Sequence, residues 1–339
     1  NGRTAILPLS GGFDSRLIAC MLKQNNYNNV ICFTYGQYNA EVPISKKVAE
    51  ILGYNWYFID YKDLEITNFQ KEKEFIKYFR NAGNGFAMPY LQEYFAVKEL
   101  KNRNLIPEDS VFLPGHSGDF LGGSYVKKTV KTKTNIANLH KHILKKYFVF
   151  SNLKNSAVIE QRISNNLKGY DCKTDSHIPY KTIIEDWDVK EKLSKFIFNS
   201  SFVFNYLGHQ HYFPLWDTQL VKHFSSLAYK DREDKMLYDE TLIKHYFNPL
   251  NVYFETDELS VSCTKRKIQR FKDNLRQFVP WKIVYKRMLK TDWIYYSAFC
   301  SELEKEMISK GQPKIKNYKY FNAVISKYYL FKLGFYNKD

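Results

Sequence analysis

The feature that most constrains the fold is a short apolar segment that runs through a glycine turn into a helical pattern. The run Ala5–Leu9 is typical of a buried strand, and Gly11 and Gly12 follow it closely. From Leu17 to Leu22, apolar residues recur at helical spacing. The order strand, glycine turn, helix is typical of the opening unit of an open α/β sheet.

The next stretch of the chain repeats this alternation. Further strands are predicted at Val30–Tyr35, Trp56–Asp60 and Ser110–Leu113, and helices at Val42–Leu52, ended by Gly53, and from about Met88 to Leu105. Alternating strands and helices predict an α/β fold with a parallel, Rossmann-like sheet and helices on both faces. Strand signals then fade, so we predict an α/β core over residues 1–127 and a mainly helical part over residues 128–339.

Composition is typical of a cytoplasmic globular protein. The chain has 339 residues, 44% of them hydrophobic, and no run approaches the roughly 18 apolar residues of a membrane span. Its first residues lack the basic and apolar regions of a secretion signal. Five scattered cysteines argue against a disulfide framework or a zinc site, so we interpret them as structural thiols. The sequence begins without methionine, which suggests that it is a piece of a longer chain.

The formal net charge of +16 favours anionic partners, although a solvated basic surface explains it equally. Residues 264–278 form a basic amphipathic pattern that predicts either a surface helix or a contact with nucleic acid or an anionic membrane. The aromatic, basic run at residues 317–336 is interpreted as a packed helix in preference to a peripheral membrane contact.

The glycine turn has the chemistry of a phosphate site. Gly11 and Gly12 allow a large anion to approach backbone N–H groups at a helix N-terminus, and Ser10 and Ser15 add hydroxyl donors. The carboxylate of Asp14 suits such a place only when a divalent cation lies between it and the phosphate, which predicts Mg²⁺. The turn lacks the lysine of the common P-loop.

These residues carry a resemblance to a known superfamily. The run Ser10–Ser15 reads S-G-G-F-D-S and resembles the S-G-G-x-D-S motif of the PP-loop ATP pyrophosphatases. The resemblance implies a loop that grips pyrophosphate in an enzyme that splits ATP between the α and β phosphates and forms an adenylylated intermediate.

Two later stretches narrow the resemblance to the synthetase domain of asparagine synthetases. Pro114–Gly123 resembles the loop S-G-E-G-x-D-E-x-x-G-G, with Asp119 at the position of the family aspartate. Tyr212–Leu242 resembles the later V-P-F-L-D segment and its lysine-bearing turn, which places Lys235 in register. The three blocks keep the family order, so the resemblance covers about residues 5–242.

The resemblance implies roles for individual residues. Asp14 and Asp119 would hold Mg²⁺ on the pyrophosphate, and Lys235 would neutralise charge on the α-phosphate. The ATP- or pyrophosphate-binding residues would also include Leu9, Ser10, Gly11, Gly12, Ser15, Phe33, Thr34, Gly115, Ser117 and Gly118. Of these, Leu9, Phe33, Thr34 and Gly115 would line the adenosine pocket. Two alternatives stay open: Leu9 and Phe33 as plain core residues, and Lys235 as a solvated side chain paired with Glu233 or Asp234.

The second loop departs from the family pattern. His116 stands where the family has glutamate, and Phe120 replaces the glutamate after the aspartate. A neutral imidazole can accept a proton from an incoming amine, so His116 is a catalytic candidate, with an ordinary surface histidine as the alternative. The change puts aspartate itself in doubt as the acceptor.

The expected function is an amide-forming ligase that uses ATP, Mg²⁺, a small carboxylate acceptor and ammonia. The acceptor would be aspartate or a sugar uronic acid of surface-polysaccharide synthesis. Asparagine synthetases obtain nitrogen from a preceding glutaminase domain, which the given sequence lacks, so a separate protein, free ammonia or a segment outside this sequence would supply it. The alternatives are a tRNA-modifying enzyme of the lysidine synthetase type and a non-catalytic nucleotide-binding relative; nucleic acid is the less favoured partner.

Overall fold

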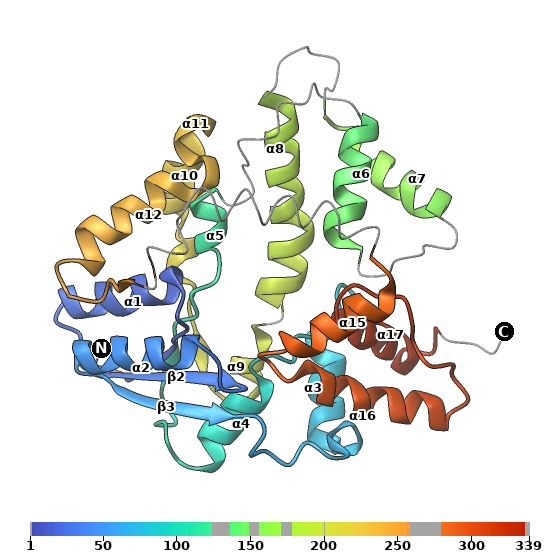
Figure 1. Ribbon diagram of the computed structural model, residues 1–339, viewed down its shortest axis with the longest axis horizontal. Helices are drawn as coiled ribbons and strands as arrows, with labels where there is room; N and C mark the ends of the chain where they lie inside the picture. The colour runs from blue at the N-terminus through green and yellow to red at the C-terminus, as the bar shows by residue number, and fades with distance from the viewer. Residues whose placement is uncertain are drawn as a thin grey trace.

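A parallel sheet of five strands organises the N-terminal part of the computed structural model (Figure 1). The structure describes residues 2–123, 136–148, 156–170, 178–199, 201–255, 257 and 279–335. The strands are β1 (Ala5–Pro8), β2 (Val30–Gly36), β3 (Asn55–Asp60), β4 (Val111–Phe112) and β5 (Gln210–His211). Their order is β3-β2-β1-β4-β5, and every neighbouring pair is parallel. The four predicted strands are confirmed. The sequence gives no signal for β5, because two residues are too few for an alternating pattern.

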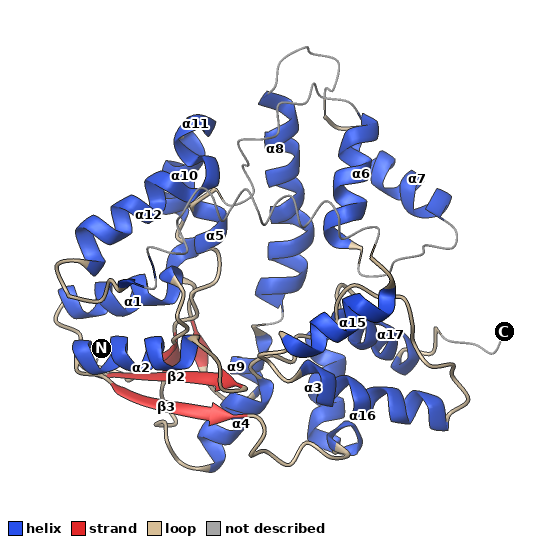
Figure 2. Ribbon diagram, viewed as in Figure 1, coloured by secondary structure: helices blue, strands red, loops and turns tan. Residues whose placement is uncertain are grey.

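Both faces of the sheet are covered by helices (Figure 2), as predicted. Successive residues of β1 point to opposite sides: Ile6 packs in one buried cluster, and Ala5 and Leu7 pack in the other. Helices α1 (Phe13–Gln24) and α2 (Glu41–Leu52) belong to the second cluster. Helices α3 (Lys73–Gly83), α4 (Tyr94–Asn102), α16 (Tyr296–Ser309) and α17 (Asn322–Lys332) belong to the first. A third, smaller cluster joins α6 (Ile136–Tyr147), α7 (Ser156–Leu167) and α8 (Ile178–Trp187).

The helices have the following bounds. They are α1 (Phe13–Gln24), α2 (Glu41–Leu52), α3 (Lys73–Gly83), α4 (Tyr94–Asn102), α5 (Gly118–Leu121), α6 (Ile136–Tyr147), α7 (Ser156–Leu167), α8 (Ile178–Trp187), α9 (Phe202–Tyr206), α10 (Thr218–Ser226), α11 (Tyr229–Arg232), α12 (Met236–Leu242), α15 (Trp281–Lys290), α16 (Tyr296–Ser309) and α17 (Asn322–Lys332). π-Helical stretches at Asp188–Phe198 and Ile243–Phe247 extend α8 and α12. The prediction of a mainly helical C-terminal part is confirmed.

One predicted helix is too long. The pattern predicts a helix from about Met88 to Leu105, whereas α4 begins at Tyr94 and ends at Asn102. Pro89 lacks a backbone N–H and disfavours helical geometry in Met88 before it, and Asn104 lies in the left-handed region with φ 52°. The residues before α4 therefore form an irregular segment that lies beside the second loop.

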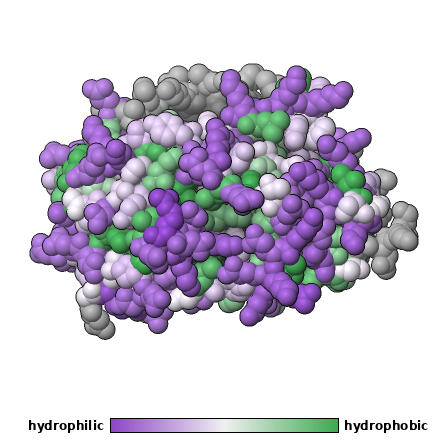
Figure 3. Space-filling view, turned by 90° about the horizontal axis from the view of Figure 1, so that it is seen from below, coloured by the Kyte–Doolittle hydropathy of each residue, from purple (hydrophilic) through white to green (hydrophobic). Residues whose placement is uncertain are grey.

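The C-terminal run at residues 317–336 contains a packed helix, as predicted. Val324, Ile325 and Tyr328 of α17 are buried in the cluster that includes α3 and α16. The basic pattern at residues 264–278 lies outside the described residues. Among the helices that the structure describes, none is long and apolar enough to cross a membrane. On the face shown in Figure 3, hydrophobic side chains lie in separate small areas among hydrophilic ones.

Candidate active site

The loop between β1 and α1 lies at the carboxyl end of the sheet, and its backbone N–H groups donate to side chains, including Gly11 N–H to the Glu41 Oε2 at 3.3 Å. The Ser10 Oγ accepts a hydrogen bond from the Gly12 N–H at 3.1 Å and lies 3.2 Å from the Ser15 Oγ. The Ser15 Oγ in turn accepts from the Ser10 N–H at 3.1 Å. The serines thus hold the turn in shape, and α1 directs its N-terminus towards the loop, where its dipole favours an anion.

A buried arginine stabilises this loop through hydrogen bonds and an ion pair. This role was not predicted from the sequence. Arg16 is 0% exposed, and it donates to the Gly11 carbonyl at 2.6 Å and to both carboxylate oxygens of Asp257 at 2.6 and 3.2 Å. The rings of Phe13, Phe247 and Phe254 lie 5.3 to 5.4 Å from its guanidinium. One sequence signal could have indicated its burial: Arg16 directly precedes the apolar pair Leu17 and Ile18, which lies on the buried side of the helix.

The three residues with the most specific predicted roles come together at one place. The Lys235 Nζ lies 3.0 Å from the Asp119 Oδ1 and 3.6 Å from the Asp14 Oδ1. Asp14 lies in the first turn of α1, Asp119 lies in α5 beyond β4, and Lys235 precedes α12, which packs against α1 (Figure 1). Because β1 and β4 are parallel neighbours, their loops meet at one edge of the sheet. Lys235 therefore pairs with these two carboxylates, and Glu233 pairs with Lys181 instead.

The electrostatics of the two carboxylates differ. Burial raises the pKa of Asp14 to about 6; the Lys235 ammonium opposes this rise, and the Asp119 carboxylate adds to it. The Asp119 side chain is 65% exposed. Burial alone would lower the pKa of Lys235, but Asp14 and Asp119 raise it above its usual value, so Lys235 is a cation at neutral pH. Tyr238 donates a hydrogen bond to Asp14 at 3.2 Å and fixes its orientation.

Close approach of the two loops requires glycine in the second one. A Cβ added to Gly118 would lie 2.2 Å from the Asp14 Cγ, and one added to Gly115 would lie 2.9 Å from the Ser15 N. Gly122 gives room to Lys235 in the same way, because its added Cβ would lie 2.9 Å from the Lys235 Cε. Ser117 has a left-handed φ of 80°, and its buried Oγ has no hydrogen-bond partner among the described residues. A donor is thus available for a ligand.

The donor set fits Mg²⁺. Two carboxylates from neighbouring loops face a common cation, which in this structure is the Lys235 ammonium. Within the part of the chain that is described, no group of three or more His, Cys, Asp or Glu residues could hold a metal ion. Mg²⁺ accepts such a sparse protein site, since phosphate oxygens and water complete its coordination. Asp14 and Asp119 would hold it.

Three of the four residues predicted to line an adenosine pocket lie inside the core. Leu9 and Phe33 are fully buried and Thr34 is 7% exposed, whereas Gly115 in the second loop is partly exposed. The Thr34 Oγ1 donates to the Leu9 carbonyl at 2.7 Å and accepts from the Trp56 Nε1 at 3.0 Å. These side chains support the strand ends in this structure. Their contact with adenosine stays a prediction, as do the roles of the other site residues.

The two departures from the family loop have different environments. Phe120 is buried and packs edge-on against Trp216 at 5.4 Å, so it has a structural contact in place of a charge. His116 lies at the opposite end of the loop, and its Nε2 is 3.6 Å from the Oε1 of Glu93, a carboxylate that is only 2% exposed. Sequence analysis missed Glu93 because the region was predicted to be an ordinary helix.

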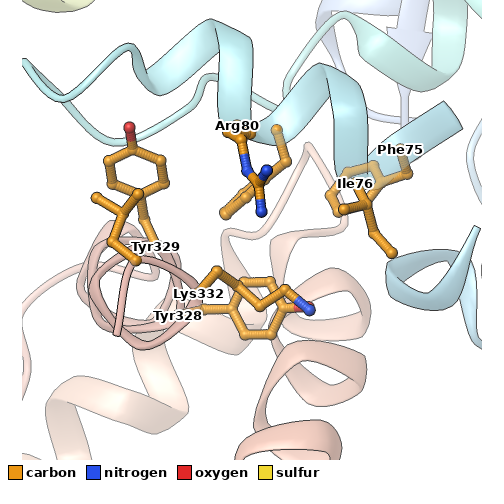
Figure 4. A pocket seen from close by; sticks show the side chains of 8 residues that line it. Phe75, Ile76, Arg80, Tyr328, Tyr329 and Lys332 are labelled. Carbon is orange, nitrogen blue, oxygen red and sulfur yellow. The ribbon is translucent and has the colours of Figure 1, made fainter. Parts of the chain in front are cut away.

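The structure also has two cavities outside the loops that follow β1 and β4. The one between α3 and α17 (Figure 4) has a volume of about 10 Å³, which suffices for one water molecule. The other is an open cavity of about 400 Å³. Its lining residues are Asn81, Asn84, Phe198, Asn199, Phe202, Asn205 and His211. Since His211 on β5 pairs with Phe112 on β4, this second cavity adjoins the strand that leads into the His116 loop.

The parallel sheet, the serine- and glycine-rich turn and the facing aspartates define an ATP-utilising enzyme of the PP-loop class. The chain belongs to the asparagine synthase family, because the family pattern described as asparagine synthase matches residues 5–239. No curated protein gives a significant match. A solved structure of the U34-tRNA thiolase NcsA from Methanococcus maripaludis with its [4Fe-4S] cluster is similar at 13% identity, over 64% of this chain and 76% of that chain, with a TM-score of 0.24. A likeness this weak carries no weight for function.

Proposed function

We propose that this protein is an amide-forming ligase that cleaves ATP to AMP and pyrophosphate. The observation that carries the proposal is the convergence of Asp14 and Asp119, from loops after two neighbouring strands, on the ammonium of Lys235. Family membership supports an ATP-dependent synthetase. The backbone N–H groups after β1 and the N-terminus of α1 would receive the β and γ phosphates.

The residues support a two-step reaction. A carboxylate oxygen of the acceptor attacks the α-phosphorus, and the bond between that phosphorus and the oxygen bridging to the β-phosphate breaks, so that pyrophosphate leaves. Lys235 neutralises the charge that develops on the α-phosphate. Mg²⁺ held by Asp14 and Asp119 would stabilise the leaving pyrophosphate. Ammonia then attacks the carbonyl carbon of the adenylylated acceptor, and AMP leaves.

The asparagine-lined cavity supports a polyhydroxylated acceptor over aspartate. Amide groups both donate and accept hydrogen bonds, which suits sugar hydroxyls, and Phe198 and Phe202 offer faces for the apolar side of a sugar ring. We therefore propose a sugar uronic acid as the acceptor, in the cytoplasm.

Two residues that line this cavity, Asn81 and Asn205, are exposed and can be replaced to test this proposal. Replacing both with leucine should raise the KM for the acceptor about tenfold, the loss of roughly one or two hydrogen bonds, whereas Asn102→Leu, at the exposed end of α4, should not.

Product analysis by ³¹P NMR tests the reaction itself. The protein is incubated with ATP, Mg²⁺ and ammonium chloride together with glucuronate, galacturonate or aspartate. We expect AMP and pyrophosphate in equal amounts with one of the acids, and their loss in Asp14→Ala and Asp119→Ala. ADP and phosphate would contradict the proposal, dependence on tRNA would favour the lysidine synthetase-type alternative, and nucleotide binding without turnover would favour the non-catalytic one.

A further inference from the structure

Glu93 is a buried carboxylate with an unused oxygen. It precedes the first residue of α4 and is 2% exposed. Its Oε1 accepts a hydrogen bond from the Tyr35 hydroxyl at 3.3 Å. Its Oε2 is buried and has no hydrogen-bond partner among the described residues. A buried carboxylate oxygen without a donor is costly, so its retention at this place points to a ligand that donates a hydrogen bond.

Glu93 is connected to the candidate active site through His116. The His116 Nε2 lies 3.6 Å from the Glu93 Oε1, which is too long for a hydrogen bond and leaves the imidazole free to take a proton from a third group. His116 is partly exposed and belongs to the loop that carries Asp119 three residues later. The carboxylate therefore lies behind the histidine, on the side away from solvent.

The remaining surroundings of Glu93 are aromatic and uncharged. Burial raises the pKa of Tyr35, Tyr61 and Tyr90, and the Glu93 charge raises each further, so these hydroxyls stay protonated. Burial and the Glu93 charge also raise the pKa of Tyr78 and Tyr296. His211, on β5, has a pKa lowered by burial and then by His116, which Glu93 opposes, so it is neutral.

This environment suits an ammonium ion better than a metal cation. Metal ions such as Mg²⁺ and Ca²⁺ require about six or more oxygen ligands, whereas this place offers one free carboxylate oxygen, an imidazole and phenol rings. Ammonium donates hydrogen bonds to a carboxylate and is attracted to aromatic faces.

We propose that Glu93 binds the nitrogen donor as an ammonium ion and that His116 removes its proton. The proposal rests on the proposed function and adds the entry point of the nitrogen. One proton of ammonium passes to the His116 imidazole, which becomes imidazolium, and the freed electron pair of ammonia forms the carbon–nitrogen bond to the adenylylated carboxylate. The carbon–oxygen bond to AMP breaks, and the nitrogen releases its second proton to solvent. Glu93 contacts the substrate nitrogen and balances the imidazolium charge.

Two assays separate this proposal from the proposed function. Exchange of labelled pyrophosphate into ATP, with the acceptor acid and without ammonia, reports adenylylation alone. Amide formation with ammonium chloride is then compared with hydroxamate formation with hydroxylamine, a weaker base that is mostly uncharged at neutral pH and needs no proton removed before attack. The variants are Glu93→Gln and His116→Asn, with Glu65→Gln and His245→Asn as exposed controls.

We expect Glu93→Gln to raise the KM for ammonium by about tenfold or more, the size of a lost charged hydrogen bond, and His116→Asn to lower kcat with ammonium. Both should change hydroxylamine use and exchange far less. Equal losses with ammonium and hydroxylamine would show that Glu93 is merely structural and would overturn the proposal, as would an unchanged KM for ammonium. His116→Asn, on the partly exposed loop, keeps the test decisive if Glu93→Gln fails to fold. If the parent exchanges no labelled pyrophosphate into ATP with any acceptor, the proposed function is overturned as well. If exchange occurs but the variants affect ammonium and hydroxylamine equally, only this inference is overturned.

Discussion

The Lys235 ammonium lies 3.0 Å from the carboxylate of Asp119, a residue 116 positions earlier in the chain. Lys235 itself has a left-handed φ of 65°, and Gly122 leaves the room that its side chain occupies. The lysine therefore links the second loop to the aspartate of the first. Under the proposed function, the same ammonium would bind a phosphate oxygen of ATP.

Replacing Lys235 with methionine should lower kcat about 100-fold, because removal of one charge-stabilising donor typically has an effect of this size. The KM for ATP should change less, since the backbone groups of the first loop remain. Steady-state kinetics with pyrophosphate detection measures both, and Lys222→Met on exposed α10 is the matched control. An unchanged kcat would assign Lys235 a purely structural role.

Gly118→Ala should weaken ATP binding about tenfold or more, because the new Cβ would overlap the Asp14 carboxylate at 2.2 Å and shift a phosphate-site residue. Gly169→Ala provides the control, since nothing lies within 4 Å of its added Cβ. Calorimetric titration with ATP and Mg²⁺ gives the affinities. Equal affinities in the two variants would contradict the close approach of the loops.

Asp257→Asn should destabilise the fold by about 3 kcal/mol, because it leaves the Arg16 guanidinium buried without its charge partner. The exposed pair Lys46 and Glu50 provides a comparison, and Glu50→Gln should cost less than about 0.5 kcal/mol. Denaturant unfolding followed by circular dichroism measures both. Similar small losses would mean that the buried pair does not anchor the first loop.

Glu302 should make stability depend on acidic pH. Burial alone would raise its pKa, but the Lys305 ammonium and the Asn68 backbone N–H lower it below the usual value. Since the folded pKa is depressed, the stabilisation is complete above the unfolded value of about 4.3 and disappears as pH falls through the folded value. Glu302→Gln should therefore cost about 1 to 2 kcal/mol at pH 7, and this cost should shrink as the pH falls from about 4.3 through the folded pKa. Chemical denaturation measures the difference in free energy of unfolding between the parent and Glu302→Gln. A difference that does not change with pH would contradict this account.

Local sequence was sufficient for the first loop and for most of the sheet. The run Ser10–Ser15 combines turn, helix start and phosphate chemistry within six residues, so its placement follows from neighbours in the chain. The carboxylate partners of Arg16 and Lys235 lie 241 and 116 residues away in the sequence. Hydrophobic periodicity cannot predict contacts between residues so far apart in the chain. Glu93 was missed because helix propensity cannot reveal that an irregular segment before α4 buries a carboxylate beside His116.

The most direct test of the central claim is calorimetric titration of the parent, Asp14→Asn, Asp119→Asn and the variant carrying both substitutions with pyrophosphate, each with and without Mg²⁺. If the two carboxylates hold one shared ion, the parent should bind pyrophosphate more tightly with Mg²⁺ than without it. Each variant should lose that difference, and the double variant should lose nothing further. Retention of the full magnesium effect in either single variant would contradict a shared site.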